Sequence, residues 1–407
     1  MRMSTSEFFS LNVNSMSEQQ SVLGQLYQQI ATGVSLSTPS DNPLGAAQAV
    51  QLSMQGAALA QYSRNQDTVL ASLQSEDTTL GEVSSVLQNI NTLLVRAGDG
   101  SLNDGNRSAI ATELQGLRNQ LMTLANATDP QGNFLFAGFK TTAQPFSVDA
   151  SGAVIYTGDT GSRDIQVSDT RQIASSDNGV TVFSGVAAVG TTSIPAGNPA
   201  NTGNGAIGGV STNNAGDPAN AHAYLITFAG TAPAITYTVT DQSTGVVSAA
   251  QPYTSSAGIT LGGQSVTISG TPAAGDSFTV TPATQAGTDV FANIDDIVSA
   301  LQTPTGSAAA VANLTNALSS AMGKLKNTMN NVVTVQASVG GREQEVQALQ
   351  TVTQASVLQT KSSLADLTTT NLTATISQYS LAQYALQAAQ QGFMKIQGMS
   401  LFNYMGN

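Results

Sequence analysis

Apolar residues recur at both ends of the chain with the spacing of a coiled-coil seam. In the first stretch, residues 12–34, and in the last, residues 358–396, the stripe advances one heptad at a time. Such a repeat keeps one apolar seam along one side of a helix. We therefore predict helices at both ends that bury these stripes when the protein assembles, the assembly positions being Met16, Leu23, Ile30, Leu372, Tyr379, Leu386, Phe393 and Ile396.

A cluster of helix-breaking residues interrupts the first helical stretch soon after residue 32. Asn42 before Pro43 is a strong helix start, because the Asn side chain caps free N–H groups and proline fits the first helical position. We predict a hinge between two domains here, formed by Gly33, Pro39, Asp41, Asn42 and Pro43. A plain helix–loop–helix within one domain is the alternative.

Further helices are predicted in the sequence next to each of these terminal stretches. A long helix is expected from residue 43 to about 96, and another at about 106–128. The second half of the first has a seam that alternates four and three residues, at Val69, Leu73, Glu76, Leu80, Val83, Leu87, Ile90 and Leu94. A short helix after Asp289 ends before Pro304, and a long one starts near 307. A boundary in that last helical stretch is expected around 362–368, where Asp and Thr favour caps over helix interiors.

The middle of the chain changes to short β-type segments separated by Gly, Asp and Ser turns. Strand patterns occur at 134–137, 153–157, 163–167 and 180–183, and again at 223–228, 235–240, 266–269 and 277–280. Between the two sets, residues 188–220 form a polar loop with almost nothing to bury.

We predict a mainly α fold with inserted β structure, in three domains. Residues 1–42 with 363–407 form a terminal coiled-coil assembly domain. Residues 43–180 with 288–362 form a helical core rod with a β-hairpin, and residues 181–287 form a solvent-facing β-rich module.

Composition narrows the class of protein. Only 9% of the residues are charged and the formal net charge is −12, so a nucleic-acid partner, which needs a basic face, is not expected. Few charges need to be desolvated when copies meet, which favours a polymerising subunit, although a low-charge secreted protein has the same composition. No apolar run is long enough for a membrane span, and no cleaved signal peptide is evident.

No catalytic, cofactor or metal motif stands out. His222 is the only histidine and there is no cysteine, so a zinc site lacks ligands. The segment T157-G-D-T-G-S-R-D164 has turn spacing but not the ligand series of a calcium loop. We expect a protein that is not an enzyme and holds neither cofactor nor metal.

Several stretches together resemble the bacterial flagellin family. I30-A-T-G-V-S-L-S-T-P-S-D-N-P43 is similar to the N-terminal signature that joins two helices, and N126-A-T-D-P-Q-G-N-F-L-F-A-G138 to the family's hairpin. Y156-T-G-D-T-G161 resembles its turn, and the closing S400-L-F-N-Y-M405 resembles its end. The resemblance covers well over half of the chain.

The resemblance implies an extracellular structural protein of the bacterial flagellum, exported through the type III apparatus with the help of an export chaperone. The F-L-F-A-G stretch and the chain ends favour a subunit that joins hook to filament as a ring, with hook-associated protein 1 and flagellin as its neighbours. A filament subunit, or a non-flagellar secreted adhesin or translocator, are the alternatives.

Overall fold

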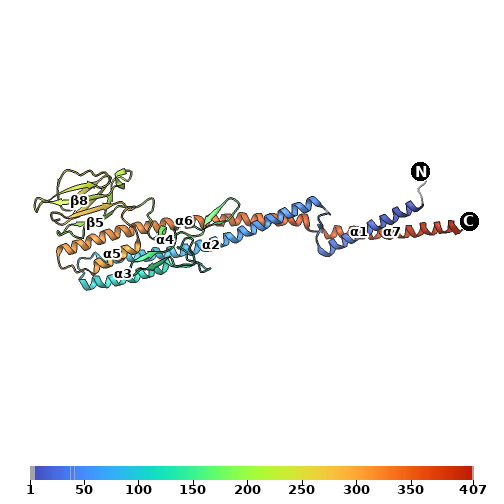
Figure 1. The fold of residues 1–407 in the computed structure, drawn as a ribbon, viewed down its shortest axis with the longest axis horizontal. Helices are drawn as coiled ribbons and strands as arrows, with labels where there is room; N and C mark the ends of the chain where they lie inside the picture. Colours follow the sequence, from blue (N-terminus) through green and yellow to red (C-terminus); the bar gives the residue numbers. More distant parts are fainter. Residues whose placement is uncertain (1–4, 37, 41, 406–407) are drawn as a thin grey trace. The chain divides into compact units, whose positions relative to one another are not determined.

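The computed structural model describes residues 5–36, 38–40 and 42–405, and helices dominate it (Figure 1). The chain divides into two compact units. The end unit consists of Met1–Arg64 with Gln350–Asn407, and the central unit consists of Asn65–Leu349. Two long helices, α2 (Pro43–Ala97) and α6 (Ala308–Thr368), each have residues in both units.

The central unit contains three further helices beside its parts of α2 and α6, and these are α3 (Asp104–Ala125), α4 (Gly179–Phe183) and α5 (Val290–Gln302). Asn103 caps α3 through the Asn106 N–H, and Asp289 caps α5 through Phe291 and Ala292. Both starts lie within two residues of the positions that the sequence predicts, because the caps are visible in the sequence itself.

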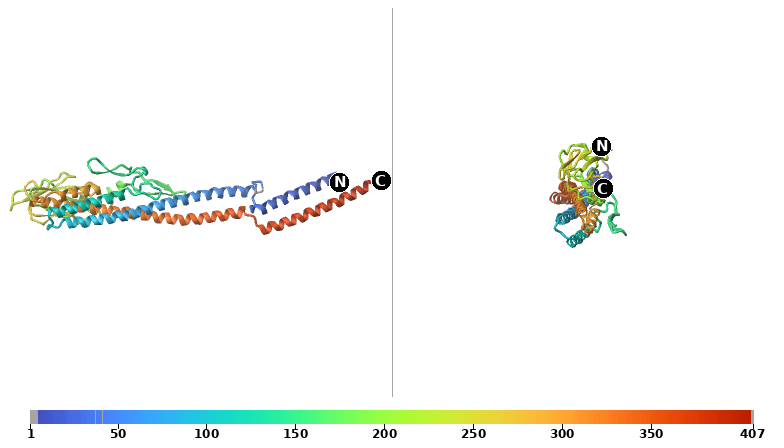
Figure 2. Two further views of the ribbon diagram at one scale, coloured as in Figure 1. Left: turned by 90° about the horizontal axis from the view of Figure 1, so that it is seen from below. Right: turned by 90° about the vertical axis from the view of Figure 1, so that its left-hand side faces the viewer.

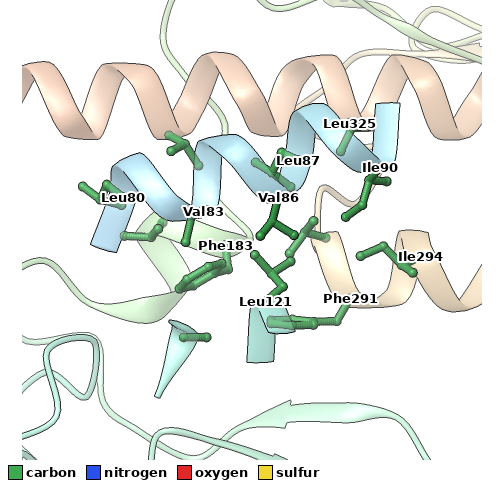
Figure 3. Packing of buried hydrophobic residues seen from close by; sticks show 14 of the residues in the cluster. Leu80, Val83, Val86, Leu87, Ile90, Leu121, Phe183, Phe291, Ile294 and Leu325 are labelled. Carbon is green, nitrogen blue, oxygen red and sulfur yellow. The ribbon is translucent and has the colours of Figure 1, made fainter. Parts of the chain in front are cut away.

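The apolar stripe of α2 forms the centre of the main core (Figure 3). Its predicted seam positions are at most 1% exposed, and they are Val69, Leu73, Leu80, Val83, Leu87, Ile90 and Leu94. Figure 3 shows Val83, Val86 and Leu87 facing Phe183, Leu121 and Phe291, which come from α4, α3 and α5. Burial of each such side chain contributes about 1.5–3 kcal/mol.

Two of the predicted strands are wrong. Residues 180–183 form α4, because Asn178 caps the Thr181 N–H at 3.0 Å and the turn buries Val182 and Phe183. Residues 134–137 form turns after an isolated bridge of Phe134 to Thr128. The Leu135 N–H bonds to the Ala127 carbonyl, so turn contacts satisfy this backbone without a partner strand.

Two small hairpins follow that turn. The first pairs β1 (Phe146–Val148) with β2 (Val154–Tyr156), and the second pairs β3 (Asp164–Gln166) with β4 (Gln172–Ala174).

The inserted module packs two antiparallel sheets on a small core of its own, which includes Ile226, Phe228, Ile268 and Phe278. One sheet has the order β10–β9–β8–β13–β5, and the other has β11–β12–β6 with β7 also pairing β12. The first contains Gln251–Pro252, Thr236–Asp241, Tyr224–Ala229, Ser277–Thr281 and Ile194–Gly197 in that order. The second contains Gly258–Leu261, Gln264–Ser269, Ala206–Ile207 and Ser211–Thr212.

The predicted polar loop 188–220 is therefore partly ordered into structure. It supplies β5, β6, β7 and the 3-10 turn Pro218–Ala221, and it buries Ile194 and Ile207. Strands of two to four residues carry too little periodicity to be recognised in the sequence.

Asparagine side chains on α6 hold the start of the module and the segment before it. Asn316 accepts a bond from the Ile207 N–H at 2.7 Å and donates to the Gly205 carbonyl. Asn327 makes the same two-way contact with the N–H and carbonyl of Thr192. Asn331 donates to the carbonyls of Thr181 and Val182. An amide that both donates and accepts can satisfy irregular backbone that has no partner strand.

A buried carboxyl group joins α2 to the segment before α4. Glu76 is fully buried, and its Oε1 accepts a bond from the Asp177 N–H at 3.0 Å. Arg342 of α6 pairs with the Asp177 carboxylate and donates to the Ala174 carbonyl. Burial, with the nearby Asp177 charge, raises the pKa of Glu76 well above its ordinary value.

We expect Asn316→Ala to lower the free energy of unfolding by about 2–3 kcal/mol, because the substitution leaves two backbone groups of the module without partners. Asn313→Ala is the matched control, since Asn313 makes one exposed bond to the Pro199 carbonyl and should cost under about 1 kcal/mol. Denaturant titration of both variants measures the difference. Equal losses would contradict a special role for Asn316.

We expect Glu76→Gln to raise the melting temperature at pH 7 by a few degrees, since a neutral amide removes the cost of a buried charge. The pKa of Glu76 is higher in the folded state than in the unfolded state, where it has its ordinary value of 4.5. Ionisation of Glu76 therefore lowers the free energy of unfolding as the pH rises from 4.5 through the folded-state pKa. The gain should therefore vanish at pH 4, as measured by melting curves across pH. Glu82→Gln, an exposed position on α2, is the control and should show neither effect.

Candidate assembly surface

The two ends of the chain pair with each other in the end unit. Helix α1 (Thr5–Thr32) lies beside α7 (Leu372–Met405), as both views show (Figures 1 and 2). The rings of Phe9 and Phe393 are 5.0 Å apart, and those of Tyr27 and Tyr379 are 6.4 Å apart. Because the start of α1 meets the later part of α7, the pair is antiparallel.

The seam between the two helices follows the heptad spacing on each of them. The positions of α1 that are turned away from solvent are Asn12, Met16, Gln19, Leu23, Leu26 and Ile30. Those of α7 are Thr375, Tyr379, Ala382, Leu386, Ala389 and Phe393. Nearly all of these side chains are only half-buried, as expected of two helices without a third layer.

Six of the predicted assembly residues lie in this seam within one chain, and they are Met16, Leu23, Ile30, Tyr379, Leu386 and Phe393. Leu372 does not, because it is the first residue of α7 and its side chain is 49% exposed. The side chain of Ile396 lies outside the described residues. Contacts of these residues with neighbouring copies stay a prediction.

A second set of apolar residues covers the outside of the pair. On α7 it comprises Leu372, Ile376, Leu381, Tyr384 and Met394, and on α1 it comprises Leu11, Val13 and Val22, while Phe9 and Tyr27 are partly exposed at the edge of the seam. On α7 this set is spread around the helix, since successive residues turn by about 100°. The only charged residue of α7 is Lys395. Apolar side chains that stay exposed on a helix with almost no charge favour a further partner.

The heptad stripe predicts only Leu372 of this second set, because the other members follow no single period. The signal that could have found it is the lack of charge: α7 has one charged residue in 34, and α1 has only Glu7 and Glu18.

The predicted hinge is tied to a second break at the other end of the chain. Gly33 has a φ of +70° and ends α1, while α6 ends at Thr368 and α7 begins at Leu372. Val34 and Thr369 form an antiparallel bridge. The Ser35 N–H donates to the Thr368 carbonyl at 2.7 Å, and the Thr370 N–H donates to the Gly33 carbonyl at 2.9 Å.

The remaining hinge residues start the next helix. Asn42 caps α2, accepting the Gly45 N–H at 2.9 Å, and Pro43 is the first residue of that helix. Pro39 lies in an exposed turn, and Asp41 lies outside the described residues. A function of this segment as a domain hinge stays a prediction, as do the three domain ranges.

Beyond the breaks, the first part of α2 and the last part of α6 face each other with small side chains. The inner positions of α2 are Gly45, Ala49, Leu52, Gly56, Leu59 and Ser63, and those of α6 include Thr353, Ser356, Thr360, Ser363 and Leu367. A methyl group placed on Gly56 would lie 3.8 Å from Cγ2 of Thr360, so the helices are in close contact there.

The side chains that could serve as ligands or catalytic groups elsewhere in the chain make structural contacts. Nδ1 of His222 lies 2.8 Å from Oδ2 of Asp241. Asp159 accepts bonds from the N–H groups of Phe139 and Gly161, which makes its segment a turn. In the described part of the chain, no three His, Cys, Asp or Glu side chains gather as a metal ion would require. None of the described helices has the length and apolar content to cross a membrane.

Known proteins resemble this chain along its whole length. The model of the bacterial flagellin N-terminal helical region matches residues 4–141. Flagellar hook-associated protein 3 of Escherichia coli strain K12 is 28% identical over 403 residues, and that of Salmonella typhimurium is 27% identical, each match covering 99% of both chains. Flagellin 1 of Proteus mirabilis matches only 31% of this chain.

Solved structures agree with the fold. The crystal structure of Xanthomonas campestris FlgL is 27% identical, has a TM-score of 0.68, and aligns with 76% of this chain and 98% of its own. The hook-associated protein 3 of Legionella pneumophila has the same TM-score at 23% identity, which supports the fold alone. The predicted mainly α fold with inserted β structure is confirmed.

We expect Leu386→Ala to lower the melting temperature of the α1–α7 pair in the free protein by several degrees, because its side chain fills the seam. Leu381→Ala is the matched control on the same helix, since Leu381 is 66% exposed and should have almost no effect. Circular dichroism of the unassembled chain would follow the helices. A larger loss from the Leu381 variant would contradict this pairing.

Proposed function

We propose that this chain, which matches hook-associated protein 3 over 99% of both chains and has a flagellin-type N-terminal region, joins hook to filament by polymerising as a ring through its terminal helices. The predicted membership of the flagellin family and the role as a structural protein of the flagellar junction are confirmed by the full-length relatives. The protein is exported and located in the bacterial flagellum. The ring and its contacts are our proposal.

The observation that supports polymerisation is the set of large apolar residues that stay exposed on α7. Pairing with α1 covers one side, and Leu381 and Tyr384 remain 66% and 71% exposed. Covering each such side chain contributes up to about 1.5–3 kcal/mol, which neighbouring copies can provide from several sides at once. With little charge on either helix, this association requires almost no desolvation of charged groups.

The junction role fits the length of the match better than a filament role does. The two relatives named hook-associated protein 3 match 99% of this chain, whereas the flagellin of Proteus mirabilis matches 31%.

The neighbours follow from that position. The chain assembles in the flagellum with hook and filament proteins, and we propose hook-associated protein 1 on one side and flagellin on the other. An export chaperone would cover the apolar side of α7 before the type III apparatus takes up the chain. We propose no enzymatic role, since the relatives are structural flagellar proteins.

We expect Leu381→Asp and Tyr384→Asp each to reduce assembly at least tenfold, because each places a charge in an apolar contact between copies. Gln383→Asp adds the same charge at an exposed polar position between them and should assemble normally. Sedimentation of concentrated protein measures assembly, and circular dichroism checks that the helices persist. Normal assembly of both apolar variants would contradict the proposal.

A further inference from the structure

Phe139 is an exposed aromatic side chain on a rigid turn. It is 62% exposed, and it is the only exposed Phe or Tyr in the central unit, all of whose residues the structure describes. Its N–H donates to Oδ1 of Asp159 at 3.2 Å, and Gly138 before it has a φ of +66°. A methyl group on Gly161 would collide with the ring, so the ring lies directly on the backbone there.

This arrangement holds the ring in place before any partner binds. A rigid exposed aromatic side chain loses little conformational entropy on binding, which is the property of the anchor residues that dominate protein interfaces.

A cavity of ≈ 540 Å³ lies elsewhere in the same unit, between α5, α6 and the end of β5 with the residues after it. Its walls are formed mainly by small and apolar side chains, including Ala196, Ile297, Ala300, Leu314, Ala317 and Ala321. The volume lies within the ≈ 300–1,000 Å³ of pockets that hold compact ligands, so an aromatic side chain with its neighbours can enter.

A lysine beside the ring and an exposed carboxylate at the cavity have opposite charge, and Lys324 also lines the cavity. Lys140 directly follows Phe139 and is exposed. Asp296 lines the cavity and its side chain is 74% exposed, with Nζ of Lys324 at 3.7 Å. Since the chain has only 13 Lys and Arg residues, a lysine next to the one exposed ring of the central unit and a carboxylate at the cavity are specific features.

We propose that Phe139 of one copy inserts into the α5–α6 cavity of a neighbouring copy, with Lys140 facing Asp296. The inference rests on the proposed function, because it requires that the chain polymerises, and it names a contact beyond the terminal helices. Ring and cavity are different surfaces of one chain, so the contact is heterologous. Repetition of a heterologous contact builds a closed ring when the rotation closes.

A disulfide tests the contact directly, because the chain has no cysteine of its own. We expect a Lys140→Cys, Asp296→Cys double variant, which keeps the Phe139 ring, to form covalent oligomers on mild oxidation of the assembled protein, since Asp296 lines the cavity. The control combines Lys140→Cys with Thr315→Cys, which is exposed on α6 and outside the cavity lining, and should remain monomeric on denaturing gels. Equal oligomers from both variants, or none from either, would overturn the contact.

A charge exchange provides the second test and does not depend on oxidation. Lys140→Asp and Asp296→Lys should each raise the concentration for half-maximal assembly about tenfold, and the double exchange should restore it to within about threefold of the unmodified chain. No change in the single variants, or no recovery in the double one, would overturn the contact.

These outcomes are distinct from failure of the proposed function. If the unmodified chain assembles and Leu381→Asp blocks assembly while the exchanged charges have no effect, only this contact is wrong. If the unmodified chain fails to sediment under any assembly condition, the polymerising function and the contact are both wrong.

Discussion

The antiparallel pairing of the two chain ends is the constraint on which the rest of the structure depends. Helices α1 and α7 are more than 300 residues apart in the sequence, and they share one seam marked by the Phe9–Phe393 and Tyr27–Tyr379 contacts. Because the chain must return to its start, the opposing parts of α2 and α6 also run beside each other. The break after α1 and the break between α6 and α7 lie side by side, because Val34 forms a bridge with Thr369.

Scarcity of charge shapes how the other parts are held. With 9% charged residues, the chain relies on amide side chains where many proteins use ion pairs, and Asn316, Asn327 and Asn331 of α6 bind backbone groups of β6, of the segment before β5 and of α4. Neutral amides avoid the desolvation cost of buried charges. Glu76 is one of the few buried charged residues, and the raised pKa of its carboxyl group reflects that cost.

The helices could be predicted from the sequence because caps and heptads are local signals. Asn42–Pro43, Asn103 and Asp289 mark starts that the structure has within two residues of the predicted positions. The short strands β6 and β7 could not be predicted, since two residues carry no period, and α4 depends on the burial of Val182 and Phe183. For the assembly surface, the heptad stripe led to Leu386 and Phe393 in the seam within one chain, whereas Leu381 and Tyr384 are exposed. Spacing alone cannot say which partner covers a stripe.

The central claim is that neighbouring copies enclose α7 on the sides that α1 leaves open. The chain has no cysteine, so Tyr384→Cys provides a single thiol at a position that is 71% exposed in the single chain. Maleimide labelling should be fast in the free protein and slowed at least tenfold after assembly, while a Val189→Cys control, at a position 76% exposed in the central unit, keeps its rate. Equal labelling of Tyr384→Cys in the free and assembled protein would contradict the account.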